Sequence, residues 1–293
     1  MKGDFENYTN KEKLAKVLLA CLNWGCSISG TSDIELKIQK RLKVQNSFDS
    51  WRIRSCIDLI EDTEHAIISF SKYGLQKFTT TSTDDFGEKY IRLYGILNAI
   101  QQQKFAIIEL LETVKFNKFR EAKETLNNLK ILEIRNVVGA HTINLLDSGE
   151  YKPDYFKTNF FRITQCKLTP KSEDLDAVDG FGNIRNYNLY RSILEYNQSS
   201  EKILYDGVLD YISRIFKNSQ NLKTEILKHY EIETLIPFNY IQIYLNDVNE
   251  KKYYDRIGKR AENHLRKTYG DNWKQIIMEI LLNPNLDKPE PKR

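Results

Sequence analysis

The sequence predicts an all-α protein: an up-and-down helical bundle with one short β-hairpin or strand and a helical C-terminal extension. Apolar residues recur at helical spacing through most of the 293 residues. Glycine (13) and proline (6) are scarce, and folds built from many turns need more of both. Four regions are expected: N-terminal helices (1–49), a helical bundle (50–150), a mainly helical C-terminal region (151–282) and a disordered tail (283–293).

Two short helices are expected in the N-terminal region. Leu18 and Leu22 belong to an apolar helical stripe, which ends in the glycine-containing segment 25–30. Ser32 and Glu35 have the spacing of a capping box. They predict the start of a second helix that continues to about residue 44.

Three long helical patterns follow in the bundle region. The first covers residues 51–73 and is followed by Gly74, a typical stop signal. The second covers 88–114, and its apolar stripe is wide enough to predict packing on more than one side. The third covers about 118–146, and no glycine interrupts it until Gly139. Short links between three such helices predict an up-and-down bundle.

The C-terminal region begins with the weakest helical signal. The β-type residues of 160–166 predict a strand or one arm of a hairpin. Segment 179–183 is predicted to be a loop, because it lacks the strand and third glycine of a nucleotide-binding fingerprint. Helical periodicity returns at 187–216 and again in shorter segments up to residue 282.

Composition narrows the class of protein. Lys plus Arg (44) against Asp plus Glu (40) gives a net charge of +4, which allows RNA contact without indicating it. The polar N-terminus does not resemble a secretory signal, and no apolar run approaches the roughly 18 residues of a membrane span. We therefore expect a cytoplasmic protein with no membrane partner. The cysteines are expected to be reduced core residues: Cys21, Cys26, Cys56 and Cys166.

No metal or cofactor site is expected. The chain has four histidines, and neither they nor the cysteines occur at the spacing of metal ligands. His65, His229 and His264 lie among charged residues of amphipathic segments, where a surface position is expected. His141 differs, because it closes a helical segment that also holds Arg135.

Polar side chains gather at an unusual place around His141. Arg135, Asn136 and His141 fall within two turns of a helix that is otherwise apolar. Burying such groups without hydrogen bonds costs a few kcal/mol each, on the order of 1–3. They therefore need either partners or a chemical role.

This stretch resembles the R-x4-6-H motif of the HEPN superfamily. Those proteins are helical bundles, many of them metal-independent endoribonucleases and others only RNA- or nucleotide-binding. Arg135 matches the motif arginine, Asn136 the polar residue usually next to it, and His141 the motif histidine. Glu133 occupies a position where acidic residues are common. These matches imply Arg135, Asn136 and His141 as catalytic residues and Glu133 as a supporting one.

The preceding helix adds to the resemblance. Residues 87–95, which include Tyr94 as a second supporting residue, are similar to the partner helix of one uncharacterised bacterial HEPN group. In that group the motif more often ends in Gly-His-Pro-Thr, whereas residues 139–142 are Gly-Ala-His-Thr. The resemblance covers about 50–150. It implies an RNA substrate, a homodimer and a role as toxin or antiphage effector, with an antitoxin or defence-system protein as a further partner.

Histidine and arginine are suited to metal-free RNA cleavage, but their spacing in this sequence keeps them apart on a regular helix. Metal-free RNA cleavage needs the ribose 2′-OH deprotonated, which suits a histidine, and the anionic phosphorus stabilised, which suits an arginine. On a regular helix, residues six positions apart are offset by about 120° and about 9 Å. Arg135 and His141 then do not converge. Either the helix breaks near Gly139, or two helices cross and the site is shared between protomers.

A structural interpretation stays open beside the catalytic one. Gly139 would end the helix, His141 would lie near its negative end, and Arg135 would pair with Glu133 or another carboxylate. The protein would then be a non-catalytic module for dimerisation, RNA binding or protein interaction. The two interpretations differ in whether His141 is exposed in a cleft beside Arg135 of the same or a partner chain.

Overall fold

The computed structural model describes residues 8–27, 33–75, 86–139, 161–164 and 174–232. Helices make up most of these residues, and a small three-stranded antiparallel sheet accompanies them. The prediction of a mainly helical fold with a short β element is confirmed at this level. No helix within the described ranges is long and apolar enough to span a membrane. The predicted helices beyond residue 232, the tail and the end of the predicted helix 118–146 lie outside these ranges.

The two N-terminal helices begin with different local structures. Helix α1 (Asn10–Cys26) opens with a capping box, in which the Thr9 hydroxyl accepts from the Glu12 amide and the Glu12 carboxylate accepts from the Thr9 amide. Helix α2 (Ile34–Leu42) follows Asp33, whose side chain makes no capping hydrogen bond and whose φ is 56°. Ser32, the predicted cap, lies outside the described residues.

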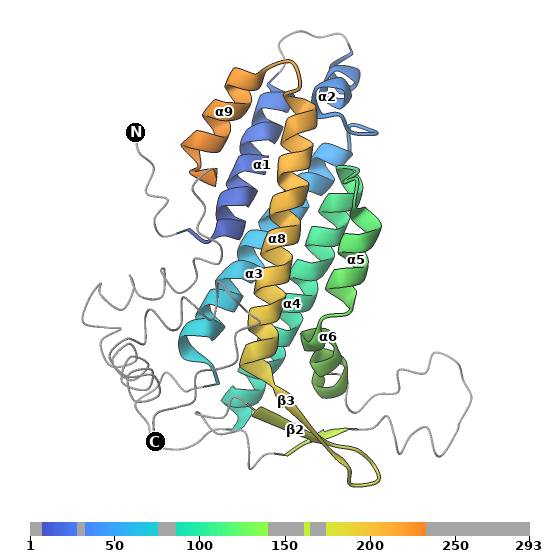
Figure 1. Ribbon diagram of the computed structural model, residues 1–293, viewed down its shortest axis with the longest axis vertical. Coiled ribbons are helices and arrows are strands. Elements are labelled where there is room, and N and C mark those ends of the chain that lie inside the picture. The colour runs from blue at the N-terminus through green and yellow to red at the C-terminus, as the bar shows by residue number, and fades with distance from the viewer. Residues whose placement is uncertain (1–7, 28–32, 76–85, 140–160, 165–173, 233–293) are drawn as a thin grey trace, which may run out of the picture.

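The two long helices of the bundle region match the prediction. Helix α3 (Asp49–Tyr73) ends at Gly74, and helix α4 (Phe86–Thr113) packs against it along much of their length (Figure 1). Gly74 has φ +58° and ψ −141°, a conformation that only glycine adopts readily. A Cβ at this position would also lie 1.8 Å from the hydroxyl oxygen of Tyr190.

The prediction of a single helix from 118 to 146 is wrong within the described residues. Helix α5 (Phe119–Asn127) ends at Asn128, and α6 (Lys130–Ile134) starts after Leu129, whose backbone is extended. Asparagine side chains compete for backbone hydrogen bonds and lower helix propensity, so Asn127 and Asn128 favour this break without a glycine. From α6 the chain continues into a π-helical turn, η2 (Arg135–Gly139).

The sheet lies at one end of the bundle, beside α6 (Figure 1). Strand β1 (Arg162–Ile163) pairs antiparallel with β2 (Asp174–Val178), and β2 pairs antiparallel with β3 (Ile184–Asn188). Asp179 closes the predicted loop 179–183 by accepting hydrogen bonds from the backbone amides of Phe181 and Asn183. The β1 strand and this loop are confirmed, whereas β2 and β3 are additional to the prediction.

Helix α8 (Leu189–Ile215) brings the C-terminal region into the bundle. It packs against α1, α4, α5 and α6, and α9 (Gln220–His229) lies beside α1 (Figure 1). The wide apolar stripe of α4 is therefore covered within the chain, by α3, α5 and α8. α8 approaches α4 closely at Gly207, where a Cβ would lie 2.2 Å from Cδ2 of Leu111.

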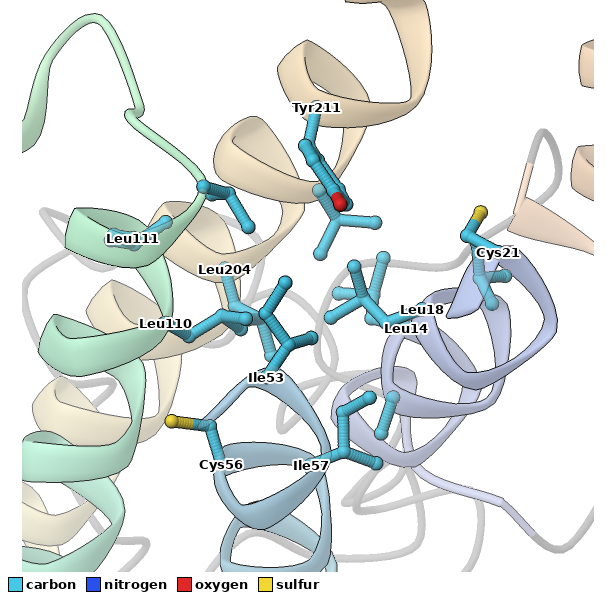
Figure 2. Packing of buried hydrophobic residues seen from close by; sticks show 14 of the residues in the cluster. Leu14, Leu18, Cys21, Ile53, Cys56, Ile57, Leu110, Leu111, Leu204 and Tyr211 are labelled. Carbon is cyan, nitrogen blue, oxygen red and sulfur yellow. The ribbon is translucent and has the colours of Figure 1, made fainter. Parts of the chain in front are cut away.

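The buried apolar residues form two clusters. The first is built mainly from α1, α3, α4, α5 and α8, and Figure 2 shows its residues from α1, α3, α4 and α8. The second is built from the sheet end of α3, α4 and α8 together with α6, η2 and the strands. Cys21 and Cys56 belong to the first cluster, and burial raises the pKa of each thiol to about 12. Cys26 is exposed, which corrects the expectation that it is a core residue. Cys166 lies outside the described residues.

Candidate functional site

The motif arginine lies where the helix changes its geometry. Arg135 is the first residue of η2, is half-buried, and donates from Nη1 to Oδ1 of exposed Asn136 at 3.1 Å. Among the residues that the structure describes, no carboxylate forms an ion pair with Arg135. Its guanidinium therefore keeps most of its donors for another group.

Glu133 belongs to a different set of contacts. Its carboxylate accepts from Lys130 of α6 and, at 3.0 Å, from the Tyr187 hydroxyl of β3. Burial raises the pKa of Glu133, but the bonds from Lys130 and Tyr187 outweigh this and leave the pKa below its ordinary value. Glu133 thus ties α6 to the sheet and stays ionised, and it is not the partner of Arg135.

Lys104 of α4 is a second cation near Arg135, outside the motif. Only 6% of the residue is exposed. Its ammonium donates to Oδ1 of Asn127 at 3.0 Å and lies 4.6 Å from the centre of the Phe105 ring. Burial lowers the pKa of Lys104, and the neighbouring charge of Arg135 lowers it further. The sequence signal is a lone lysine on an apolar face, between Ile100 and Ile108.

Tyr94 of α4 is exposed and does not belong to the core. Its ring centre is 5.7 Å from that of Tyr90, one turn earlier. Partial burial, followed by the nearby Tyr90 hydroxyl, raises the pKa of Tyr94, so the phenol stays protonated near neutrality. The described contacts place Tyr94 in an aromatic pair, and they do not join it to Arg135.

His141 lies outside the described residues, so the distance between the two motif side chains is not part of the structure. Two other histidines are described and are exposed, as expected: His65, with Nδ1 3.5 Å from Glu12, and His229, packed edge-on against Tyr230. Within the described ranges, no group of His, Cys, Asp or Glu side chains is arranged to hold a metal ion.

The first part of the motif segment, Arg135–Gly139, is a π-helical turn and not a regular α-helix. An offset of about 120° between residues six positions apart assumes a regular α-helix. A π-helix bonds each amide to the carbonyl five residues earlier, so it turns less per residue, and such turns are frequent at functional sites. The regular-helix offset therefore does not apply from Arg135 to Gly139.

Comparison of the chain with protein-family models, with curated proteins and with solved structures found no match. Near Arg135, each of the two cations donates to an asparagine oxygen, Lys104 to Asn127 and Arg135 to Asn136.

Proposed function

We propose that the protein is a metal-independent endoribonuclease of the HEPN type. The observation that supports this best is the state of Arg135, a half-buried guanidinium with no carboxylate partner among the described residues. The structural interpretation required Arg135 to pair with Glu133 or another carboxylate, and Glu133 is bonded to Lys130 and Tyr187 instead. An arginine kept unpaired is suited to binding phosphate oxygens.

In the proposed reaction the RNA supplies its own nucleophile. His141 removes the proton of the ribose 2′-OH, and the 2′-oxygen attacks the adjacent phosphorus. The bond from phosphorus to the 5′-oxygen of the next nucleotide breaks, which leaves a 2′,3′-cyclic phosphate, and the 5′-oxygen takes a proton from water to leave as a hydroxyl. Arg135 stabilises the negative charge that builds up on the phosphoryl oxygens. Asn136, which accepts a hydrogen bond from Arg135 at 3.1 Å, orients the guanidinium. Glu133 positions the segment by tying α6 to β3.

We further propose that the active form is a homodimer through α4. The broad stripe of α4 is covered within the chain, but Ile91, Tyr94 and Phe105 remain exposed. At about 100° per residue, these three side chains lie within about 60° of one another around the helix. Exposed apolar side chains on one face favour contact with another protein surface. A second copy would bring a second Arg135–His141 segment to the site.

The biological role that the resemblance implies is that of a toxin or antiphage effector in the cytoplasm, controlled by an antitoxin or a defence-system protein. The alternative proposal is a non-catalytic dimerisation, RNA-binding or protein-interaction module. The exposed face of Ile91, Tyr94 and Phe105 favours that alternative equally, because a docking surface serves both functions.

An RNA-degradation assay separates the two proposals. The purified protein is expected to cleave a labelled oligoribonucleotide in the presence of EDTA and to leave an all-deoxy oligonucleotide intact, because the latter lacks the 2′-OH. His141→Ala should lower the rate about 10²–10⁴-fold, whereas His65→Ala, at an exposed histidine, should leave it unchanged. Equal rates for wild type and His141→Ala, or binding without cleavage, would remove the catalytic proposal.

A further inference from the structure

Two cations in the described part of the chain, Lys104 and Arg135, interact through their charges, and no described carboxylate forms an ion pair with either. Lys104 belongs to α4, and Arg135 begins η2, which packs against α4. Their hydrogen-bond partners are amide oxygens, Asn127 for Lys104 and Asn136 for Arg135. Only 6% of Lys104 is exposed, so burial adds to the cost of keeping two like charges near each other.

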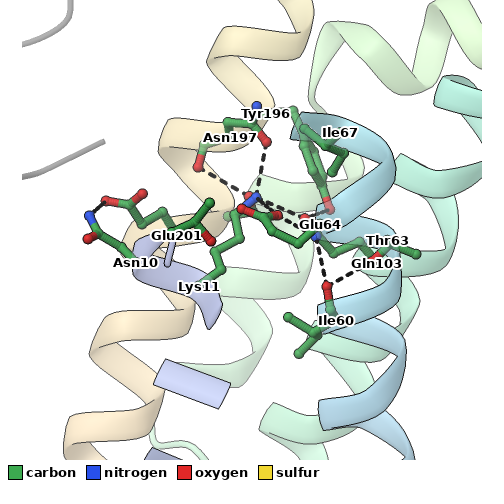
Figure 3. A network of polar contacts seen from close by, with 12 residues as sticks. Asn10, Lys11, Ile60, Thr63, Glu64, Ile67, Gln103, Tyr196, Asn197 and Glu201 are labelled. Carbon is green, nitrogen blue, oxygen red and sulfur yellow. Dashed lines mark hydrogen bonds and ion pairs between the residues drawn. The ribbon is translucent and has the colours of Figure 1, made fainter. Parts of the chain in front are cut away.

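The same chain shows how a buried lysine is held when its role is structural. Lys11 of α1 is fully buried, and its ammonium lies 3.3 Å from the Glu64 carboxylate, 2.9 Å from Oε1 of Gln103 and 3.0 Å from Oδ1 of Asn197 (Figure 3). Three acceptors thus match the three donors of the ammonium, and one of them carries the opposite charge. Lys104 has one amide oxygen, one aromatic face and a cation as neighbour.

The donors and acceptors around Lys104 and Arg135 indicate the charge of a ligand that they would bind. Each asparagine uses its oxygen to accept from a cation, which leaves its NH₂ group as a donor. An ammonium, a guanidinium and two amide NH₂ groups therefore lie on neighbouring elements, and all of them donate. Such a set binds oxygen atoms of an anion, and the planar fork of arginine matches a phosphate group in particular.

We propose that Lys104, Asn127, Arg135 and Asn136 form a binding site for a phosphate group, and that Lys104 binds the substrate beside the motif arginine. The phosphate class follows from the four side chains alone. The identification of this phosphate as a phosphodiester of RNA rests on the proposed function. Lys104 then lies in the path of the RNA backbone, and Asn127 holds its ammonium in position.

The RNA arm of the test measures affinity without cleavage. A labelled 2′-O-methyl oligoribonucleotide lacks the nucleophilic hydroxyl, and its binding is followed by fluorescence anisotropy. Lys104→Met removes the charge and keeps the stem, so it should weaken binding about tenfold or more. It should also lower the slope of log affinity against log salt concentration by about 0.7. Asn127→Asp should weaken binding similarly, because it gives Lys104 a counter-charge.

Lys123→Met is the matched control. Lys123 is an exposed lysine of α5 whose ammonium also lies over an aromatic ring, that of Phe119 at 5.7 Å. Its loss should leave the affinity for the oligonucleotide unchanged. Thermal unfolding provides a second control: a structural lysine at position 104 would lower the melting temperature when lost, whereas the proposed site predicts that Lys104→Met melts at or above the wild-type temperature.

A second arm uses inorganic phosphate and does not depend on RNA. Phosphate should raise the melting temperature of the wild type more than that of Lys104→Met, at ionic strength matched with chloride. If RNA is cleaved but Lys104→Met binds the oligonucleotide and phosphate as the wild type does, the site is overturned and the proposed function stands. If the wild type neither binds nor cleaves RNA but phosphate discriminates the variants, the site stands and the proposed function fails. Absence of both effects overturns both.

Discussion

Lys11 of α1 and Glu64 of α3 form an ion pair at 3.3 Å in which neither side chain is exposed to solvent. Gln103 of α4 donates to the same carboxylate at 2.8 Å, and Tyr196 of α8 donates to Gln103 at 3.2 Å. The group connects four helices through one buried polar layer (Figure 3). Burial lowers the pKa of Lys11, while the charges of Glu64 and Glu201 oppose that shift.

Lys11→Met should therefore destabilise the protein strongly. The substitution leaves the Glu64 carboxylate buried without a counter-charge, which costs about 3–5 kcal/mol. Denaturant unfolding followed by circular dichroism measures the loss. Lys202→Met, which breaks the exposed pair with Asp206, should cost less than about 1 kcal/mol. A double variant, Lys11→Met with Glu64→Gln, should recover part of the stability, and equal losses for Lys11→Met and Lys202→Met would contradict the prediction.

Gly74→Ala should destabilise the end of α3. A residue with a side chain is strained at φ +58° and ψ −141°, at a cost of about 1–3 kcal/mol, and its Cβ would also meet the Tyr190 hydroxyl. Gly95→Ala is the matched control in α4, where a Cβ meets nothing within 4 Å. That substitution should stabilise the protein by about 0.5–1 kcal/mol. Stabilisation by both substitutions would show that position 74 does not require glycine.

Glu133 should make a pH-dependent contribution to stability. Its pKa is lower in the folded protein than in the unfolded chain, so the stabilisation is present above the unfolded pKa and is lost as the pH falls through the folded pKa. Because the side chain is 43% exposed, solvent limits the effect to about 1 kcal/mol or less. The melting temperatures of wild type and Glu133→Gln should differ near pH 7 and converge in acid. A difference that grows in acid would have the wrong sign.

The proposed dimer should depend on the exposed face of α4. Ile91→Glu and Phe105→Glu place charges on side chains that are 74% and 49% exposed, so the fold should survive while association is lost. Ile184→Glu is the control, because Ile184 is 65% exposed on β3 and belongs to no proposed interface. Sedimentation velocity at micromolar concentration distinguishes the species. A wild-type monomer, or dimers of equal strength in all three variants, would refute the α4 interface.

Hydrophobic periodicity predicted the helices that are marked by local sequence signals. The apolar spacing of 51–73 and 88–114, with Gly74 as a stop, gave α3 and α4 within a few residues. The break at Leu129 was not predicted, because no glycine or proline marks it. Lys11 lies in the polar run Asn10–Lys13, which has the composition of a solvated helix start, yet all four residues are buried.

The sequence likewise predicted only the part of the candidate site that lies within one stretch of chain. The sequence pointed to Arg135 and Asn136, which are neighbours in the chain and do form a hydrogen bond. It did not point to Lys104, because Lys104 comes near Arg135 only when α4 packs against η2. Glu133 was one carboxylate considered as a partner for Arg135, but Tyr187, 54 positions away, takes one of its oxygens. Long-range contacts of this kind carry no local signal.

The buried polar layer also constrains when the N-terminus can fold. The partners of Lys11 lie 53, 92 and 186 positions further along the chain. During synthesis, α1 leaves the ribosome before α8, and its lysine has its full set of acceptors only after Asn197 of α8 has followed. Until then the apolar face of α1, with Leu14 and Leu18, lacks the α8 residues that cover it. We therefore expect nascent chains that end before α8 to expose this face to chaperones.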